Sequence, residues 1–121
     1  MKIVISGRIP SKKNSRLTFA RGNKIINIPS KAYASWHKDA LEQLSSYSGG
    51  LLEDIEKVTL SFWAPDKRSS DLSNKTESIM DLLVDKGILK DDNWFIVPRL
   101  ELVLKGIDRV NPRCEIDIVG R

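Results

Sequence analysis

The sequence has little cysteine and no long apolar run, and each shortage excludes a class of protein. Among its 121 residues, Cys114 is the single cysteine and His37 the single histidine. One cysteine excludes an intrachain disulfide and a zinc site built on several cysteines. No stretch reaches the roughly 18 apolar residues of a membrane-spanning helix, and the N-terminus does not resemble a signal peptide. We therefore expect a cytoplasmic protein in which His37 has a structural or surface role and Cys114 is buried in a strand.

The charged residues are unevenly distributed along the chain. The sequence contains 20 Lys and Arg against 16 Asp and Glu, for a formal net charge of +4. Positions 11–31 contain no acidic residue. Their basic residues are Lys12, Lys13, Arg16, Arg21, Lys24 and Lys31. The acidic residues concentrate between Glu53 and Asp92. A basic segment that attracts phosphate, beside an acidic group suited to a metal ion, is typical of nucleic-acid recognition.

Length and periodicity predict one α+β domain that spans residues 1–121. Alternating apolar residues predict strands at 2–6 and 57–64, and apolar residues at helical spacing predict helices at 31–44 and 73–86. Short strands are expected at 16–20 and 24–28, and the glycine in the sequence R-G-N between them predicts a hairpin. A further strand is expected at 94–106, interrupted near Pro98. A closing strand is expected at 114–119, paired back on it as a hairpin. We expect a small mixed sheet with both helices packed on one of its faces.

The stretch from Ser70 to Asn93 contains the residues that point to a chemical function. At about 100° per residue, its helix has an apolar side that should face the sheet and a polar side opposite. The apolar side consists of Ile79, Leu82 and Leu83. The polar side consists of Asn74, Glu77, Asp81 and Asp85. Asp71 precedes the helix, Asp91 and Asp92 follow it at the start of the next strand, and the predicted topology permits these carboxylates to meet.

Converging carboxylates suit a hard divalent cation. Aspartates are ionised at neutral pH and repel one another unless a cation lies between them. Magnesium, with manganese as a substitute, fits all-oxygen ligands better than zinc does, and such a cation polarises a phosphodiester for hydrolysis. The alternative interpretation is the solvated face of an amphipathic helix, with Asp71 as a helix cap and residues 91–93 as an ordinary turn.

The order of these residues resembles the RusA-type Holliday junction resolvases, a family common in phage and prophage genomes. The resemblance lies in D-L-S-N at 71–74, Asp81 in the helix, Gly87, and the pair Asp91-Asp92 at the family's spacing. The segments I-P-S-K-K-N-S-R and I-P-S-K-A-Y also resemble parts of the family. The resemblance implies a RusA-like fold and a homodimer that cuts four-way DNA junctions symmetrically with magnesium, in recombination and repair.

The resemblance also implies roles for single residues. By position, Asp71 and Asp92 correspond to the metal-binding and catalytic aspartates. Asp91 and Asp81 are neighbouring residues of the motif, with Asp91 a further candidate ligand and Asp81 a further candidate catalytic residue.

The sequence departs from the family at two positions. Ser73 stands where the family usually has an aspartate, and Glu77 stands where it usually has a lysine. In one interpretation, Glu77 restores the missing carboxylate as a metal ligand and catalytic residue, and Lys75 restores the positive charge. In the other, the protein binds junctions or other branched DNA on the same fold and is catalytically impaired.

Basic and amide side chains around the acidic stretch are the expected DNA contacts, because attraction to phosphate dominates affinity for DNA. In the N-terminal loop they are Lys12, Lys13, Asn14 and Arg16. Beside the acidic motif they are Lys67, Arg68, Asn74 and Lys75. Trp94 follows the motif closely, and we expect it in the core. Base stacking and a dimer interface are the alternatives for this side chain.

Overall fold

A computed structural model of the chain describes residues 1–11, 16–21 and 24–121, with the backbone alone over 16–21 and 24–29. The elements follow the order β1 (Lys2–Ser6), β2 (Arg16–Arg21), β3 (Lys24–Pro29), α1 (Lys31–Gln43), β4 (Ile55–Ala64), α2 (Leu72–Asp85), β5 (Leu100–Ile107) and β6 (Arg113–Gly120). The predicted α+β class is confirmed. Across these ranges no helix has both the length and the apolar character needed to cross a membrane.

The main sheet is four-stranded and mixed, in the order β1-β6-β4-β5. β4 and β5 are parallel, whereas β6 runs antiparallel to both β4 and β1. A parallel pair needs a long crossover, and α2 supplies it between β4 and β5. The predicted hairpin between the last two strands is therefore wrong. β6 lies against the opposite edge of β4, between β4 and β1.

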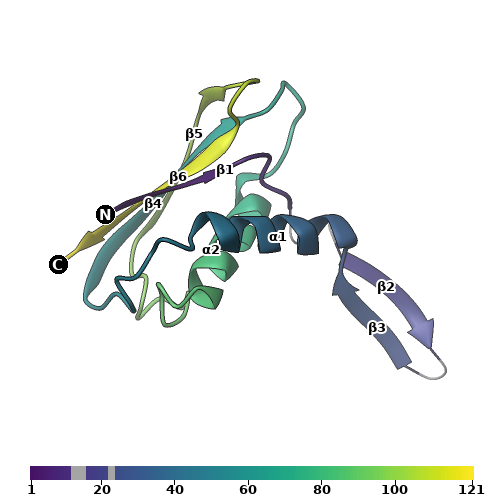
Figure 1. Ribbon diagram of the computed structural model, residues 1–121, viewed down its shortest axis with the longest axis horizontal. Helices are drawn as coiled ribbons and strands as arrows, with labels where there is room; N and C mark the ends of the chain where they lie inside the picture. The colour runs from purple at the N-terminus through teal and green to yellow at the C-terminus, as the bar shows by residue number, and fades with distance from the viewer. Residues whose placement is uncertain (12–15, 22–23) are drawn as a thin grey trace.

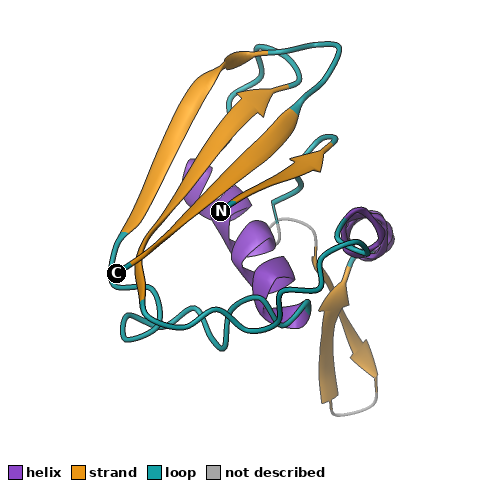
Figure 2. Ribbon diagram, turned by 60° about the vertical axis from the view of Figure 1, so that its left-hand side comes forward, coloured by secondary structure: helices purple, strands orange, loops and turns teal. Residues whose placement is uncertain are grey.

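β2 and β3 form a separate two-stranded antiparallel sheet, with Arg21 opposite Lys24 in the register. The predicted hairpin in this region is confirmed. The hairpin extends away from the four-stranded sheet, near the start of α1 (Figures 1 and 2).

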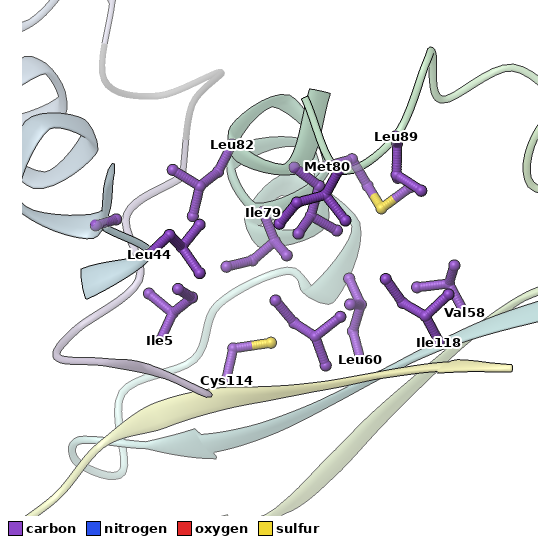
Figure 3. Close-up of a cluster of buried hydrophobic side chains, with 14 of the residues drawn as sticks. Ile5, Leu44, Val58, Leu60, Ile79, Met80, Leu82, Leu89, Cys114 and Ile118 are labelled. Carbon is purple, nitrogen blue, oxygen red and sulfur yellow. The ribbon is translucent and has the colours of Figure 1, made fainter. Parts of the chain in front are cut away.

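One core joins the two helices to the sheet. Both helices lie on the same side of the sheet, as Figures 1 and 3 show, and apolar side chains fill the space between. The predicted inward side of α2 is confirmed, because Ile79, Leu82 and Leu83 have no exposed surface. Cys114 is buried in β6, as expected. His37 has a structural contact, because its Nε2 lies 2.9 Å from Oδ2 of Asp85 and joins α1 to α2.

Both ends of α2 follow from the local sequence. Asp71 occupies the N-cap position with extended backbone angles, and Gly87 follows the C-cap with φ of +81°. Glycine adopts this left-handed conformation without the steric penalty of a Cβ atom. The strand predicted at 94–106 starts later than expected, at Leu100. Residues 91–97 form turns instead, which leaves Asp91 and Asp92 outside the sheet.

Candidate functional site

A cavity with basic walls lies at the N-terminal end of α2. Its volume is about 450 Å³, and it is lined by the loop after β4, the first turn of α2 and the end of β5. Three of the predicted DNA contacts lie in its wall: Lys67, Arg68 and Lys75. Leu72, Leu104 and Ile107 add an apolar part. This basic cavity therefore combines cations that attract phosphate with apolar surface.

Arg68 in the basic cavity is paired with Asp66. Nη2 and Nε of Arg68 donate to Oδ2 of Asp66 at 2.8 and 3.1 Å, and the backbone N–H of Arg68 donates to Oδ1 at 3.0 Å. These hydrogen bonds lower the pKa of the Asp66 carboxyl to about 2. The pairing holds the loop before α2 in a fixed turn, and the Arg68 side chain remains exposed.

Arg8 belongs to the same cluster, and sequence reasoning did not select it. Its Nη1 lies 3.9 Å from Oδ2 of Asp66, and its side chain is 55% exposed. The signal in the sequence was weak, namely a position in the loop that leads into the basic segment. The cluster thus contains four cations and one carboxylate: Arg8, Lys67, Arg68 and Lys75 with Asp66.

Two side chains of α2 hold the N-terminal loop. Nζ of Lys75 donates to the carbonyl oxygen of Ile9 at 2.6 Å, and Oγ of Ser78 donates to that of Pro10 at 2.6 Å. Burial lowers the pKa of Lys75, and the charge of Arg8 lowers it further. The N-terminal loop is therefore held against α2 at Ile9 and Pro10.

Asp71 occupies a cap position without acting as a side-chain cap. In the described structure, its carboxylate makes no hydrogen bond to a backbone N–H of the first turn of α2. Its Oδ2 accepts a hydrogen bond from Nδ2 of Asn74 at 3.3 Å, and the residue is exposed. The helix N-terminus does not use this carboxylate for capping, so a ligand can reach it.

The other acidic residues lie on a braced turn, residues 90–95, which we call the acidic turn. The backbone N–H of Asp92 donates to Oδ1 of Asp91 at 2.8 Å, and Nδ2 of Asn93 donates to Oδ2 of Asp91 at 3.0 Å. Oδ1 of Asn93 accepts from the backbone N–H of Phe95 at 3.0 Å. Every residue of the acidic turn is exposed, whereas Leu89 and Val97 on either side are buried.

The pKa values of the two aspartates of the acidic turn shift in opposite directions. Hydrogen bonds from the backbone of Asp92 and from Asn93 lower the pKa of Asp91. Desolvation raises the pKa of Asp92, and its hydrogen bond with Asp91 and the negative charges of Asp91 and Asp81 raise it further. Asp81 of α2 therefore acts electrostatically on Asp92, and the acidic turn lies close to the second half of the helix.

Asp71 and the acidic turn lie at opposite ends of α2 (Figure 1). A helix of 14 residues is about 21 Å long at 1.5 Å per residue. Two cavities at opposite ends of β4 show the same separation. The basic cavity is lined by Ala64, the last residue of β4. Phe95 of the acidic turn lines a different cavity, together with Ile55, the first residue of β4. A single chain therefore does not bring Asp71 and Asp92 together.

The donor chemistry of the acidic turn fits magnesium, although one chain offers few ligands. In residues 1–11, 16–21 and 24–121, no three His, Cys, Asp or Glu side chains gather in a way that could hold a metal ion. Magnesium commonly takes one or two protein carboxylates and completes its shell with water and phosphate oxygens. Asp91 and Asp92 provide such oxygens, and a cation would offset the repulsion that helps to raise the pKa of Asp92.

The remaining predicted site residues belong neither to the basic cavity nor to the acidic turn, or they lie outside the described residues. Glu77 is exposed on α2, between Asn74 and Asp81. Lys12, Lys13 and Asn14 lie outside the described residues. Arg16 begins β2, where only the backbone is described. The assignment of these side chains to DNA or metal stays a prediction.

Two aromatic rings project from the acidic turn. Trp94 is 78% exposed and Phe95 is 84% exposed, and their rings meet edge to face with centroids 6.2 Å apart. The expectation that Trp94 lies in the core is therefore wrong. The turn at Asn93 replaces the first part of the predicted strand, and it directs both rings out of the core. The two rings therefore form exposed aromatic surface directly beside Asp92.

The fold and these groups define a small α+β protein with a basic cavity at one end of α2 and an acidic turn at the other. Comparison with known proteins gives a specific relative. The chain is 27% identical over 105 residues to the crossover junction endodeoxyribonuclease RusA of Aquifex aeolicus (strain VF5), with 85% of this chain and 82% of that protein covered. No family model matches the chain. The similarity supports the RusA-like relationship that the order of the acidic residues indicated.

Proposed function

We propose that this chain is a magnesium-dependent endonuclease that resolves four-way DNA junctions by symmetric cleavage of two strands. The observation that carries the proposal is the similarity to the RusA crossover junction endodeoxyribonuclease over most of both chains. The acidic residues of the motif are present in this chain, and Asp71, Asp91 and Asp92 are exposed to a substrate.

The basic cavity is the proposed binding surface for the DNA backbone. Lys67 is exposed and Arg68 keeps a 68% exposed side chain despite its pairing with Asp66. Arg8 adds a third exposed cation beside them. Phosphate contacts of this kind fix the position of DNA on a protein and supply much of the affinity.

Magnesium is the proposed cofactor, with manganese as a substitute. When bound, the ion would polarise the scissile phosphate and offset the charge that develops there. Asp71 and Asp92 are the proposed principal ligands, with Asp91 and Glu77 as further ligands. Asp81 is proposed to act on Asp92 through its charge, as the raised pKa of Asp92 suggests.

The proposed protein is a homodimer, because a four-way junction has approximate two-fold symmetry and two matched cuts require two matched sites. The runner-up function is a protein that binds junctions without cutting them, and it is favoured by Ser73 and Glu77, the two departures from the family pattern.

The test is cleavage of a labelled four-way junction with magnesium, beside an Asp92→Asn variant and a linear duplex. Paired nicks in the junction alone, absent in the variant, are the expected result. Tight junction binding without nicks, in magnesium and in manganese, would establish the runner-up. Equal binding to junction and duplex, with no cleavage of either, would refute both functions.

A further inference from the structure

We infer that a second cavity, beside the acidic turn, binds an unpaired nucleobase of the DNA strand. The inference rests on the proposed function and deepens it, because it names the feature of a branched substrate that the chain recognises. The second cavity lies between residues 51–55, the acidic turn and Arg121, and its volume is about 270 Å³. This volume is close to the lower limit of small-molecule sites, about 300 Å³. It suits one heterocyclic base and excludes a base pair.

The first observation is an aromatic ring with apolar neighbours in the wall of the second cavity. Phe95 is 84% exposed, and Leu51 of the same wall is 45% exposed. Ile96 adds half-buried apolar surface beside them. A base stacks on such a ring whatever its identity, because every base has a π-face. The apolar part of the second cavity therefore fits the ring system of a nucleotide.

The second observation is that the second cavity carries both signs of charge. Lys90 and Arg121 are exposed in its wall, and in the part of the chain that the structure describes neither forms a salt bridge. Such cations attract phosphate. Glu53 and Asp54 provide carboxylates, and carboxylates accept hydrogen bonds from the amino groups of bases. A nucleotide combines the three counterparts, namely a ring, hydrogen-bond donors and a phosphate.

The third observation is that the walls of the second cavity are fixed by backbone hydrogen bonds. The N–H of Leu52 donates to the carbonyl oxygen of Ile88 at 2.9 Å, and the N–H of Arg121 donates to that of Asp54 at 2.8 Å. Asp54 has a φ of +54°, in the left-handed region that favours glycine. Backbone strain of this kind gathers at ligand sites. A preformed site also loses less binding energy to the ordering of its own residues.

The second cavity adjoins the proposed cleavage site. Lys90 and Phe95 belong to the acidic turn, which also carries Asp91 and Asp92. A base held in the second cavity would therefore bring its neighbouring phosphates to these carboxylates. In a continuous duplex every base is paired and stacked, and extracting one has an energetic cost that is least for a base already unpaired. The second cavity should therefore favour branched or single-stranded DNA over an intact duplex.

Removal of the bases from a DNA strand provides the decisive experiment. The protein is titrated, in EDTA, into two labelled duplexes that carry single-stranded tails of equal length. One tail consists of adenine nucleotides and the other of abasic residues, and fluorescence anisotropy measures both dissociation constants. The adenine tail should bind about tenfold more tightly, as the stacking of one base predicts. Equal affinity for the two tails would overturn the inference.

Variants of the two exposed rings locate the contact. Phe95→Ala should remove the preference for the adenine tail, and Phe95→Tyr, which keeps an aromatic ring, should retain it. Trp94→Ala is the matched control, because Trp94 is 78% exposed but is not among the described residues that line the second cavity. It should retain the preference. Lys90→Gln should weaken binding to both tails by the same factor, because a phosphate contact does not depend on the base. A preference lost in Trp94→Ala and kept in Phe95→Ala would overturn the inference.

Photocrosslinking gives the position of the base directly. A tail with iodouracil in place of one adenine is irradiated with the wild-type protein, and mass spectrometry identifies the modified residue. The adduct should form on Phe95. An adduct on Trp94 alone would place the base outside the second cavity and overturn the inference.

The outcomes separate the inference from the proposed function. A base preference that depends on Phe95, in a protein that cuts no junction, supports the second cavity and removes the nuclease proposal. Junction cleavage by a protein with equal affinity for the two tails keeps the nuclease and overturns the inference. If Phe95→Ala changes the oligomeric state in sedimentation equilibrium but leaves the base preference intact, the ring belongs to a protein interface and the inference fails. Displacement of the adenine tail by deoxyadenosine monophosphate at the same concentration would show a site for free nucleotides and would also overturn it.

Discussion

The ammonium group of Lys75 donates a hydrogen bond to the carbonyl oxygen of Ile9 at 2.6 Å, although the two residues are 66 positions apart in the sequence. Sequence reasoning selected Lys75 as a DNA contact. In the structure, its side chain is half-buried and holds the N-terminal loop against α2. Its contribution to DNA binding is therefore expected to be indirect, through the position of that loop.

Lys75→Met tests this role. The variant keeps much of the length of the side chain but leaves the Ile9 carbonyl without its donor, so the free energy of unfolding should fall by about 1–3 kcal/mol. Urea denaturation measures the effect.

Lys67→Met is the matched control, because Lys67 is exposed on the same cavity wall. The control should leave stability within about 0.5 kcal/mol and lower the slope of log K against log salt for DNA binding by about 0.9. A Lys75→Met protein with unchanged stability and a smaller salt slope would show a direct phosphate contact instead.

The Asp66–Arg68 pair predicts an unusually acidic carboxyl group. The pKa of Asp66 is lowered from 3.8 to about 2 by the side-chain and backbone hydrogen bonds of Arg68. Because the folded pKa lies below the unfolded value, this carboxylate stabilises the fold above pH 3.8 and loses that contribution as the pH falls through about 2. Carbon-13 NMR titration should show the low midpoint. Arg68→Ala should return it towards 3.8, and an unchanged midpoint would refute the assignment.

The acidic turn should show a split titration before any metal is added. Asp91 should titrate below 3.8, because the backbone of Asp92 and the side chain of Asn93 donate to it. Asp92 should titrate above 3.8, because of desolvation and its proximity to Asp91 and Asp81. Asp81→Asn should lower the pKa of Asp92, and Lys86→Gln, which changes a charge at the C-cap of α2, should not.

Proton competition links this titration to the proposed cofactor. Protonated Asp92 is a poor ligand for a hard cation, so magnesium affinity should decrease as the pH falls through the raised pKa of Asp92. Calorimetric titration with magnesium at a series of pH values measures this dependence. Affinity that follows only the lowered pKa of Asp91 would exclude Asp92 as a ligand.

Cys114 should be chemically inert in the folded protein. Desolvation, with a smaller effect from Glu115, raises the pKa of its thiol to about 12, and the thiolate is the reactive form. Ellman's reagent at pH 8 should therefore leave the native protein unlabelled and react with one thiol per chain in guanidinium chloride. Rapid labelling of native protein would show that β6 opens readily.

The helices and most strands could be predicted from the sequence, because their apolar patterns are long and their boundaries have strong local signals. Gly87 has a positive φ, as glycine after a helix commonly does, and Ile79, Leu82 and Leu83 face the core as their spacing requires. The pairing of β6 could not be predicted in the same way. Strands that follow one another in the chain often form hairpins, so β6 was expected to pair with β5. Instead, β5 pairs with one edge of β4 and β6 pairs with the other edge.

The residues of the candidate site could be predicted from the sequence, but their positions relative to one another could not. The spacing of Asp71, Asp81 and Asp92 identified the acidic motif, and helix geometry placed Asp81 on a polar side. Whether Asp71 and Asp92 meet depends on the path of residues 86–99. The apolar residues of this segment show neither helical nor strand spacing, so its path could not be predicted from the sequence. Trp94 was assigned to the core because large aromatic residues are mostly buried on average. The side-chain bonds of Asn93, which direct the ring outward, leave only a weak signal in the sequence.

The place of β6 between β1 and β4 has a consequence for how the protein is made. In the register, Lys2 of β1 lies opposite Asp117 of β6, so β1 finds its partner only after more than a hundred further residues have left the ribosome. Until then, the nascent chain exposes β1 and one edge of β4 as open strands, and open strand edges recruit other chains. Translation that stops before β6 should therefore yield aggregates instead of a smaller folded protein, because β1 and β4 are joined only through β6.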